Sequence, residues 1–431
     1  MENNNLEMIE VNYKNKKRYN CAKTPIRQPR FFTWLIYVLS KIMLLGKKVK
    51  IEKINMEGVK PPYLMLSNHM YFIDFELAAV ALYPHRMNNI VSIDGYYRRP
   101  WLMELIGCMT TRKFTPDLNL VKSMLRCFKR GDAVGLYPEA RYTAQGAKSF
   151  IPESVAKMVK LGKVPVVTVI HHGNHLHTPF WNWRDKRKVP FYTVVKQILT
   201  VEQIKNMSVE EINEVIQKEM KYNEYDYQKE NNILIKKKTR AEGLNKILYQ
   251  CPHCKKEGKM YSKGHELYCE ECGKRWNFNE DGTLEAQDGN TEFTKVTDWY
   301  EWERSEVRKQ VRSGEYHFED EVEVYGFPRC YKFFKLGKAK VRHTIEEGFV
   351  LEGHYRGEDY RILKRPIEAN SLHLEYEWCY VKPYDCFDIS IERDSLFCYP
   401  TKRDVITKLG FATEELYQMH LERVRKGSET V

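Results

Sequence analysis

Short apolar runs and helical periods alternate along residues 51–200. The strand-like runs are Val49–Ile54, Tyr63–Ser67, Ile90–Ile93, Ala133–Tyr137 and Val164–Ile170. Apolar residues recur at helical spacing in the segments Phe72–Leu82, Leu120–Arg130 and Ser154–Leu161. Strands and helices in this order predict an α/β domain in which helices flank a mixed sheet.

Residues 201–248 are polar, charged and mostly helical by propensity. Ser208 is expected to begin one helix, because Glu211 three residues later completes a capping-box pattern. We therefore expect the α/β domain to occupy residues 51–248.

Residues 286–431 carry a different pattern. A helix over Trp299–Val311 is followed by short strand-like runs, among them Glu321–Tyr325 and Phe349–Tyr355, and then by a final helix over Thr401–Arg425. Strands followed by one terminal helix predict a small β-rich domain, a barrel or a sandwich. We identify no catalytic chemistry in it.

The most apolar segment, Phe31–Leu45, is about fifteen residues long and contains Lys41, whereas a spanning helix needs roughly twenty apolar residues. Basic residues flank it on both sides. An aromatic-rich segment of this kind predicts a helix that lies in a membrane interface. A buried N-terminal helix is the alternative. We assign residues 1–50 to a basic tail and a membrane-docking helix.

The formal net charge of +12 favours an anionic partner and leaves nucleic acid, anionic lipid and a phosphorylated cofactor open. Residues 1–30 show no apolar stretch typical of a signal peptide. We expect a cytoplasmic protein bound peripherally to the inner face of the cell membrane.

Four of the eleven cysteines form two C-x-x-C pairs, Cys251 with Cys254 and Cys269 with Cys272. Two such pairs let four thiolates converge on one ion, which predicts a structural zinc site in a zinc ribbon over residues 249–285. Disulfides or an iron–sulfur centre are the alternatives. The histidine-rich stretch 171–177 is a weaker metal candidate, and a role in a substrate loop or at a strand end is favoured there.

A histidine and a carboxylate lie five positions apart, at His69 and Asp74. In one regular helix these side chains point away from each other, so they meet only where a loop turns into a helix. A histidine can remove the proton of an attacking hydroxyl, and a carboxylate on its other nitrogen fixes the tautomer. Taken alone, the pair also fits a histidine that caps a helix.

Two further segments offer cations near strand ends. Glu139 and Arg141 follow the predicted strand Ala133–Tyr137, and Arg112 and Lys113 lie between the two motifs. A guanidinium can form two hydrogen bonds to a phosphate, and Glu139 could orient an arginine or bind an acceptor hydroxyl. Surface ion pairs are the alternative for each segment.

Together these residues resemble the glycerolipid acyltransferase family. The first family motif, N-H-x-x-x-x-D, corresponds to Asn68, His69 and Asp74. The second, an arginine after a glycine-terminated helix, corresponds to Gly107 and Arg112.

The third family motif usually reads P-E-G-T-R. Here Pro138 and Glu139 are followed by Ala140 and Arg141, so alanine replaces glycine and the arginine stands one position early. The fourth motif, an apolar strand with a proline, corresponds to residues 164–167. The resemblance covers about residues 45–220. The departure in the third motif affects the expected identity of the acceptor more than the expected type of reaction.

The resemblance implies an acyltransferase with His69 as general base, Asp74 as its partner, and Arg112, Glu139 and Arg141 as substrate-binding residues. The donor would be acyl-CoA or acyl carrier protein. The acceptor would be lysophosphatidate, as in a 1-acylglycerol-3-phosphate O-acyltransferase of phospholipid biosynthesis, on an anionic membrane lipid surface.

Three other functions are weighed. The acceptor could be another polar lipid. A zinc-ribbon module that binds nucleic acid is a different class, but no recognition motif for DNA or RNA accompanies the cysteines, so we expect no nucleic acid. A catalytically inactive lipid-binding protein is disfavoured because all the expected catalytic residue types are present.

Overall fold

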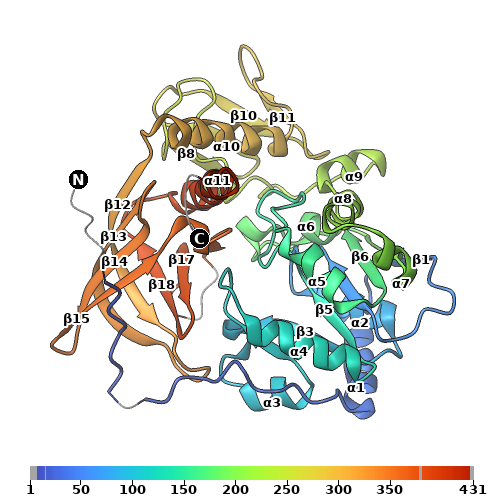
Figure 1. Cartoon of the computed structure of the whole chain (residues 1–431). Coiled ribbons are helices and arrows are strands. Elements are labelled where there is room, and N and C mark those ends of the chain that lie inside the picture. The colour runs from blue at the N-terminus through green and yellow to red at the C-terminus, as the bar shows by residue number, and fades with distance from the viewer. Residues whose placement is uncertain (1–6, 15, 378–380, 428–431) are drawn as a thin grey trace.

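The computed structural model describes residues 7–14, 16–377 and 381–427. Its first sheet has seven strands in the order β1-β7-β6-β2-β5-β3-β4 (Figure 1). The strands are β1 (Val49–Ile54), β2 (Leu64–Ser67), β3 (Met87–Ser92), β4 (Met109–Thr111), β5 (Ala133–Leu136), β6 (Val166–His172) and β7 (Phe191–Leu199). Strands β2 to β6 are parallel, while β7 is antiparallel to β6 and parallel to β1. The predicted mixed α/β sheet is confirmed.

Alternate residues of β2 face opposite layers of helices, as the two-residue period of a strand requires. Leu64 and Leu66 belong to a core with α4 (Leu118–Lys129), α5 (Ser154–Gly162) and α8 (Val209–Glu219). Met65 belongs to a second core with α2 (Ile73–Leu82) on the other face. Helix α8 begins with the predicted capping box, in which Ser208 Oγ accepts a hydrogen bond from the backbone N–H of Glu211.

Helix α1 (Arg30–Met43) packs on α2 and leaves an apolar face uncovered. Its Tyr37 ring stacks on Tyr83 at 4.1 Å between centroids. Large apolar side chains that are about half exposed or more on this helix and just after it are Phe31, Trp34, Leu39, Ile42, Met43 and Leu45. Within the described residues, no helix is long and apolar enough to cross a membrane.

The segment before α1 is a strap across the molecule rather than a free basic tail. Ile9 forms a β-bridge to Arg361 near the edge of the C-terminal sheet, and the buried Tyr13 donates a hydrogen bond to Asp394 at 2.5 Å. Further along, Arg27 forms an ion pair with Asp132 of the α/β region.

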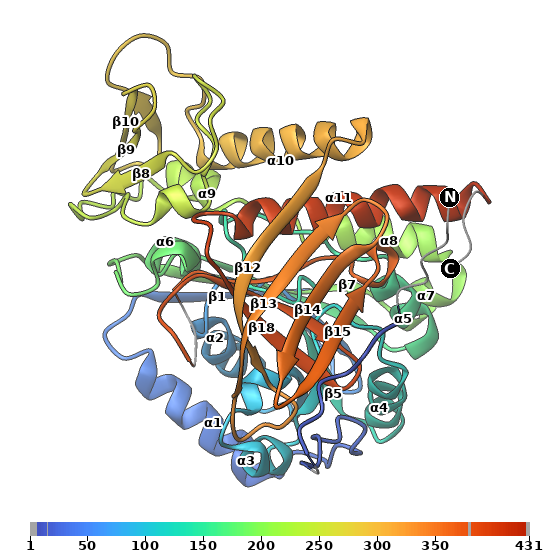
Figure 2. The same cartoon turned by 90° about the vertical axis from the view of Figure 1, so that its left-hand side faces the viewer.

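The C-terminal region is built on one antiparallel sheet of seven strands in the order β15-β14-β13-β12-β18-β17-β16. The strands are β12 (His317–Gly326), β13 (Phe334–Thr344), β14 (Gly348–Tyr355), β15 (Glu358–Lys364), β16 (His373–Glu375), β17 (Cys386–Ile391) and β18 (Asp394–Pro400). The β-rich region and its terminal helix are confirmed. The sheet is single and curved, with β15 and β16 as edges, so it differs from the expected barrel or sandwich (Figure 2).

Two long helices flank this sheet in the chain, one before β12 and one after β18. Helices α10 (Val296–Ser313) and α11 (Ile406–Arg425) pack against each other, with the Tyr300 and Phe411 rings 4.6 Å apart. A small antiparallel sheet lies beside them, with the strands β8 (Met260–Lys263), β9 (Glu266–Cys269), β10 (Arg275–Phe278) and β11 (Leu284–Ala286).

A single hydrophobic core crosses the expected boundaries at residues 248 and 285. It contains Leu176 and Trp181 of the α/β region, Trp276 of the small sheet, and Leu374 and Leu416 of the C-terminal region. Because a large apolar interface opposes relative motion of domains, we infer that the C-terminal region is a permanent wall of the α/β region.

Candidate active site

His69 and Asp74 meet where β2 ends and α2 begins. The Nδ1 atom of His69 lies 3.0 Å from Oδ2 of Asp74. Residues 68–72 form the loop between the two elements, and Asp74 is in the first turn of α2. A carboxylate is favoured there because the N–H groups of a helix start point outward. The expected turn from loop into helix is present.

Asp74 is fully buried and held by four hydrogen-bonding groups. Besides His69, the backbone N–H groups of Met70 and Tyr71 donate to it at 2.6 and 3.1 Å, and the side-chain amide of Asn174 donates at 2.6 Å. Burial alone acts to raise the pKa of Asp74, but hydrogen bonds and nearby histidines outweigh it and lower the pKa. Asp74 therefore stays ionised, and sequence reasoning missed Asn174 although it lies within the histidine-rich stretch.

Burial lowers the pKa of His69, and Asp74 opposes this only in part. The imidazole is therefore neutral at neutral pH, and its Nδ1 is held by Asp74, so Nε2 is the nitrogen that can accept a proton. The ring packs against Tyr137 and Tyr142, whose centroids lie 4.1 and 4.3 Å away. These aromatic neighbours were also missed, although Tyr137 directly precedes the third motif.

Asn68 anchors the loop that carries His69. Its side-chain amide donates to the carbonyl of His171 at 2.9 Å, and its carbonyl oxygen accepts from the backbone N–H of His171 at 2.9 Å. On the other side, the backbone N–H of Thr143 donates to the carbonyl of His69 at 2.8 Å. Neighbouring strand ends thus fix the position of His69.

Glu139 lies beneath the third-motif turn and does not contact Arg141. It accepts hydrogen bonds from the backbone N–H of Ser149 at 3.0 Å and from the hydroxyl of Tyr222 at 3.1 Å. Burial raises its pKa to about 7. The next residue, Ala140, has φ +54°, a conformation that favours glycine, which accounts for the glycine of the family pattern.

Arg141 points away from His69 into the C-terminal region. Its Nη2 donates to Oε1 of Glu414 on α11 at 2.7 Å, and its Nη1 donates to the carbonyl of Leu372 at 3.4 Å. The side chain is only 6% exposed. The hydrogen-bonding partners of Arg141 therefore lie in the C-terminal region, while its charge acts on Glu139 through space and works to lower the pKa of that carboxyl.

Arg112 is likewise buried against the C-terminal sheet. Its Nη1 donates to Oγ of Ser395 at 3.0 Å, and its Nη2 donates to the carbonyl of Arg393 at 3.2 Å. The neighbouring Lys113 ammonium lies 2.5 Å from Nε2 of His373 and 3.9 Å from Asp94.

Two hollows lie near the His69 loop, one along α2 and one at the carboxyl end of β6. The first is a mostly apolar cavity between α1 and α2, lined by Ile36, Phe75, Ala78 and Leu82, with Tyr137 in its wall. Because Tyr137 also packs on His69, its ring separates this cavity from the imidazole.

The second hollow is an open groove at the ends of β6, β7 and β1. Lys50, Lys218 and Lys221 line it, together with the rings of His172 and Tyr227, which stack at 4.7 Å. Strand β6 is adjacent to β2, and strands lie about 4.8 Å apart. The groove therefore begins one to two strand spacings from the His69 loop.

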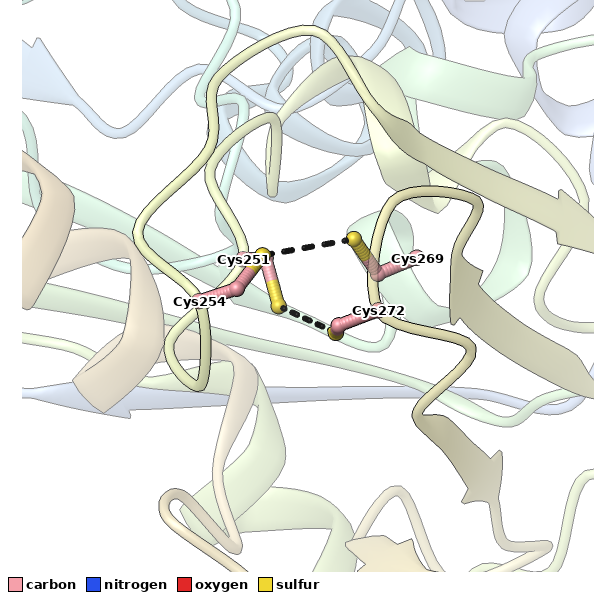
Figure 3. A group of neighbouring side chains, drawn as sticks. All are labelled: Cys251, Cys254, Cys269 and Cys272. Atoms are coloured by element: carbon pink, nitrogen blue, oxygen red, sulfur yellow. Dashed lines mark hydrogen bonds between the residues drawn. The ribbon is translucent and has the colours of Figure 1, made fainter.

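The four cysteines form a compact sulfur cluster between the small sheet and its preceding loop (Figure 3). Sγ of Cys251 lies 3.8 Å from Sγ of Cys272, and Sγ of Cys254 lies 3.7 Å from Sγ of Cys269. A tetrahedral zinc with Zn–S bonds of about 2.3 Å places its sulfurs about 3.8 Å apart. The four residues fit such an ion, and none of them forms a disulfide.

The histidine-rich stretch forms no comparable cluster among the described residues. His171 is hydrogen-bonded to Thr193 at 3.0 Å and His172 to Glu224 at 3.1 Å. The other group of potential metal ligands within the described ranges consists of Asp94, His373 and Glu375. The ammonium of Lys113 lies against that group.

Residues 48–172 match the model of a protein family described as Acyltransferase, which supports an acyltransferase domain over this range. The crystal structure of the 1-acyl-sn-glycerophosphate (LPA) acyltransferase, PlsC, from Thermotoga maritima is similar at 14% sequence identity and a TM-score of 0.37. The similarity covers 44% of this chain and 77% of that chain. No curated protein matches the chain. The matched family range contains His69, Asp74, Arg112, Glu139 and Arg141.

Proposed function

We propose that this acyltransferase domain moves a fatty acyl group from an activated thioester to the hydroxyl of a lysolipid, with His69 as general base. The hydrogen-bonded pair of His69 and Asp74 at the carboxyl edge of the sheet carries this proposal. It is the edge at which open α/β sheets bind their ligands, and the matched family range surrounds it.

In the proposed reaction, Nε2 of His69 takes the proton of the acceptor hydroxyl as its oxygen attacks the thioester carbonyl carbon. The new C–O bond forms, the C–S bond breaks, and the leaving thiolate takes the proton back from the imidazolium. Asp74 stabilises the imidazolium and holds its tautomer. A serine or cysteine nucleophile is unnecessary, because the thioester is already activated.

The proposed donor is acyl-CoA or acyl carrier protein. Both carriers present a phosphopantetheine, so an anion must lie near the site while the thioester reacts. The groove with Lys50, Lys218 and Lys221 suits such an anion.

The proposed membrane contact is the uncovered face of α1. Half-exposed aromatic residues such as Phe31 and Trp34 are suited to the interface, and Lys47 and Lys48 follow directly. An anionic surface at the inner face of the cell membrane would attract these lysines. This proposal includes no nucleic-acid partner.

The proposed cofactor is one structural zinc bound by the four cysteines. Four protein ligands leave no open position for substrate, so the ion would stabilise the small sheet and the core beneath it. Cys269 belongs to that core.

The test is an acyl-transfer assay with radiolabelled acyl-CoA and acyl carrier protein against a panel of lysolipids in anionic vesicles. Wild type should transfer label, and His69→Ala should lose roughly 10²–10⁴ in rate with its unfolding temperature retained. His354→Ala, at an exposed histidine of β14, is the matched control. Equal activity in wild type and His69→Ala would contradict the mechanism.

A further inference from the structure

We propose that the acceptor lipid carries no phosphate monoester, because the C-terminal region occupies Arg112, Lys113 and Arg141, the cations of the family motifs. The lysines of the open groove are assigned to the phosphopantetheine of the donor. This inference rests on the proposed function and names its acceptor class. A lipid whose uncharged head bears the acceptor hydroxyl, such as a monoacylglycerol or a glycolipid, meets this requirement.

Both terminal nitrogens of Arg141, Nη1 and Nη2, are hydrogen-bonded to protein groups. Glu414, its partner on α11, is 3% exposed and accepts a second ion pair from Arg304 and a hydrogen bond from Ser371 at 2.6 Å. A phosphate that approached Arg141 would meet this buried carboxylate. Like charges at close range repel strongly in a medium of low dielectric constant, so the guanidinium presents no anion site.

Arg112 is buried as well, with Nη1 and Nη2 bonded to groups of the C-terminal sheet and Nε buried without a hydrogen-bond partner. Its partner Ser395 is hydrogen-bonded to Ser390 at 2.8 Å, and Ser390 donates to Asp388 at 2.9 Å. This polar chain is buried throughout. A ligand would have to break it to reach the guanidinium, and buried polar groups that lose their partners are costly.

Lys113, the third cation of this group, is surrounded by acidic side chains. Asp94 lies beside its ammonium, and His373 is flanked by Glu375 and Asp388. Asp94, Glu375 and Asp388 already balance two cations in this group, Lys113 and a His373 whose pKa, against the effect of burial, the neighbouring carboxylates raise to about 9. A dianionic phosphate would therefore add negative charge to a group that is already balanced.

The common core argues against a C-terminal region that opens to release these cations. Phe180 of the α/β region packs edge-on against Tyr376 at 5.5 Å, and both rings are buried. The same core contains Tyr142, which also packs on His69. Separation would expose the core beneath the candidate base.

What surrounds His69 instead is aromatic. Tyr137 and Tyr142 lie against the imidazole, and the Tyr71 ring lies 6.2 Å from Tyr142. Aromatic rings pack against the apolar faces of sugars and against glycerol carbons, and burying these groups does not require a charge to be buried. The site is therefore built for a hydroxyl on an uncharged head.

The test compares two acceptors that differ only by the phosphate, 1-acylglycerol 3-phosphate and 1-acylglycerol, in phosphatidylcholine vesicles with the full chain. We expect kcat/KM for 1-acylglycerol to exceed that for the phosphorylated acceptor at least tenfold. We also expect Arg141→Gln to leave this ratio unchanged within threefold, whatever its total activity. A preference for the phosphorylated acceptor that disappears in Arg141→Gln would overturn the inference.

A binding measurement decides the question even if neither acceptor is acylated, so failure of the proposed function remains distinguishable. Calorimetric titration with glycerol 3-phosphate, the head of the phosphorylated acceptor, should show no saturable binding that depends on Arg112 or Arg141. Any saturable binding by the wild-type chain should persist in Arg141→Gln and be lost in Lys218→Gln/Lys221→Gln, because it belongs to the lysine groove. Saturable binding that is lost in Arg112→Gln or Arg141→Gln, with the variant still folded at the temperature of the titration, would overturn the inference.

Discussion

Arg141, in the turn after β5, and Glu414, in the middle of α11, form a buried ion pair with Nη2 and Oε1 2.7 Å apart. The two residues are 273 positions apart in the chain. Arg304 shares the same carboxylate. Two segments that sequence reasoning assigns to different domains therefore depend on one another for charge balance.

The first prediction concerns the stability that this pair provides. Glu414→Ala leaves the buried Arg141 without a carboxylate and leaves Arg304 with only the exposed Glu301, whereas Arg141→Ala leaves Glu414 paired with Arg304. Breaking a buried pair costs about 3–5 kcal/mol, so both variants should be destabilised, Glu414→Ala more than Arg141→Ala. Urea unfolding of purified variants measures this. Equal stability of wild type and Glu414→Ala would contradict the ion-pair assignment.

The matched control for that series is Glu422→Ala. Glu422 also lies on α11 and pairs with Arg312, and the side chains of this pair are 47% and 43% exposed. Because solvent screens exposed pairs, this substitution should cost no more than about 1 kcal/mol.

The second prediction concerns Asp74. Asp74→Asn keeps the size of the side chain but removes the charge that stabilises the imidazolium and selects its tautomer. Acyl transfer should fall on the order of 10³–10⁴-fold, as in other histidine–aspartate pairs. Steady-state kinetics with the panel acceptor that wild type uses best measure the loss. A variant within tenfold of wild type would show that Asp74 is a structural cap only.

The third prediction is the pH profile of kcat/KM. The base form of His69 is needed, and burial lowers the pKa of this histidine below its ordinary value of about 6.5. Activity should therefore persist at pH 6.5 and fall only at lower pH, as the imidazole becomes protonated. In Asp74→Asn the residual activity should fall at still lower pH, because the carboxylate that favours the imidazolium is gone. A midpoint above pH 6.5 in wild type would refute this.

The fourth prediction concerns Glu139, whose pKa burial raises to about 7 from an unfolded value near 4.5. The folded state holds the proton more tightly, so this group stabilises the fold fully below pH 4.5. Its contribution is lost as pH rises through about 7. Glu139→Gln should abolish this pH-dependent component, about 3 kcal/mol. Urea unfolding at pH 4.5 and pH 8 measures it.

The control for Glu139 is Glu230→Gln at an exposed position, which should keep the wild-type slope between the two pH values. A Glu139→Gln variant with the same slope as wild type would show that the carboxyl group is ionised in the fold throughout this range.

The fifth prediction concerns the four cysteines. Purified protein should retain one zinc per chain after dialysis, and a strong chelator should lower its unfolding temperature. Cys269→Ser should lose the metal, because a structural site needs all four ligands, whereas Cys21→Ser, at a cysteine outside the cluster, should retain it. Elemental analysis gives the stoichiometry. Wild-type protein without bound metal and unaffected by chelator would contradict the assignment.

The parts that sequence predicted well depend on neighbours in sequence. His69 and Asp74 are five positions apart, and the loop between β2 and α2 alone brings them together. The sulfur cluster likewise comes from two local turns and one short hairpin. For these features, residues that are close in the sequence are also close in the fold.

The features that could not be predicted from the sequence depend on partners far away in the chain. Nothing near Arg112 or Arg141 indicates that Ser395 and Glu414, hundreds of positions later, bind them. The curved single sheet was also missed, because alternating strand patterns are the same in open sheets, barrels and sandwiches. In this region the hydrophobic pattern predicts which segments are strands, whereas the pairing of distant strands determines the architecture of the sheet.

The N-terminal strap has a consequence for how the protein is made. A ribosome releases Tyr13 before its partner Asp394, which lies 381 positions later, and releases Ile9 before its partner Arg361. Because chains begin to fold from the N-terminus as they are synthesised, the strap must wait unpaired while the α/β region forms. A protein shortened by a premature stop before β15 therefore loses more than the strands that follow, since Ile9 and Tyr13 also lose their partners.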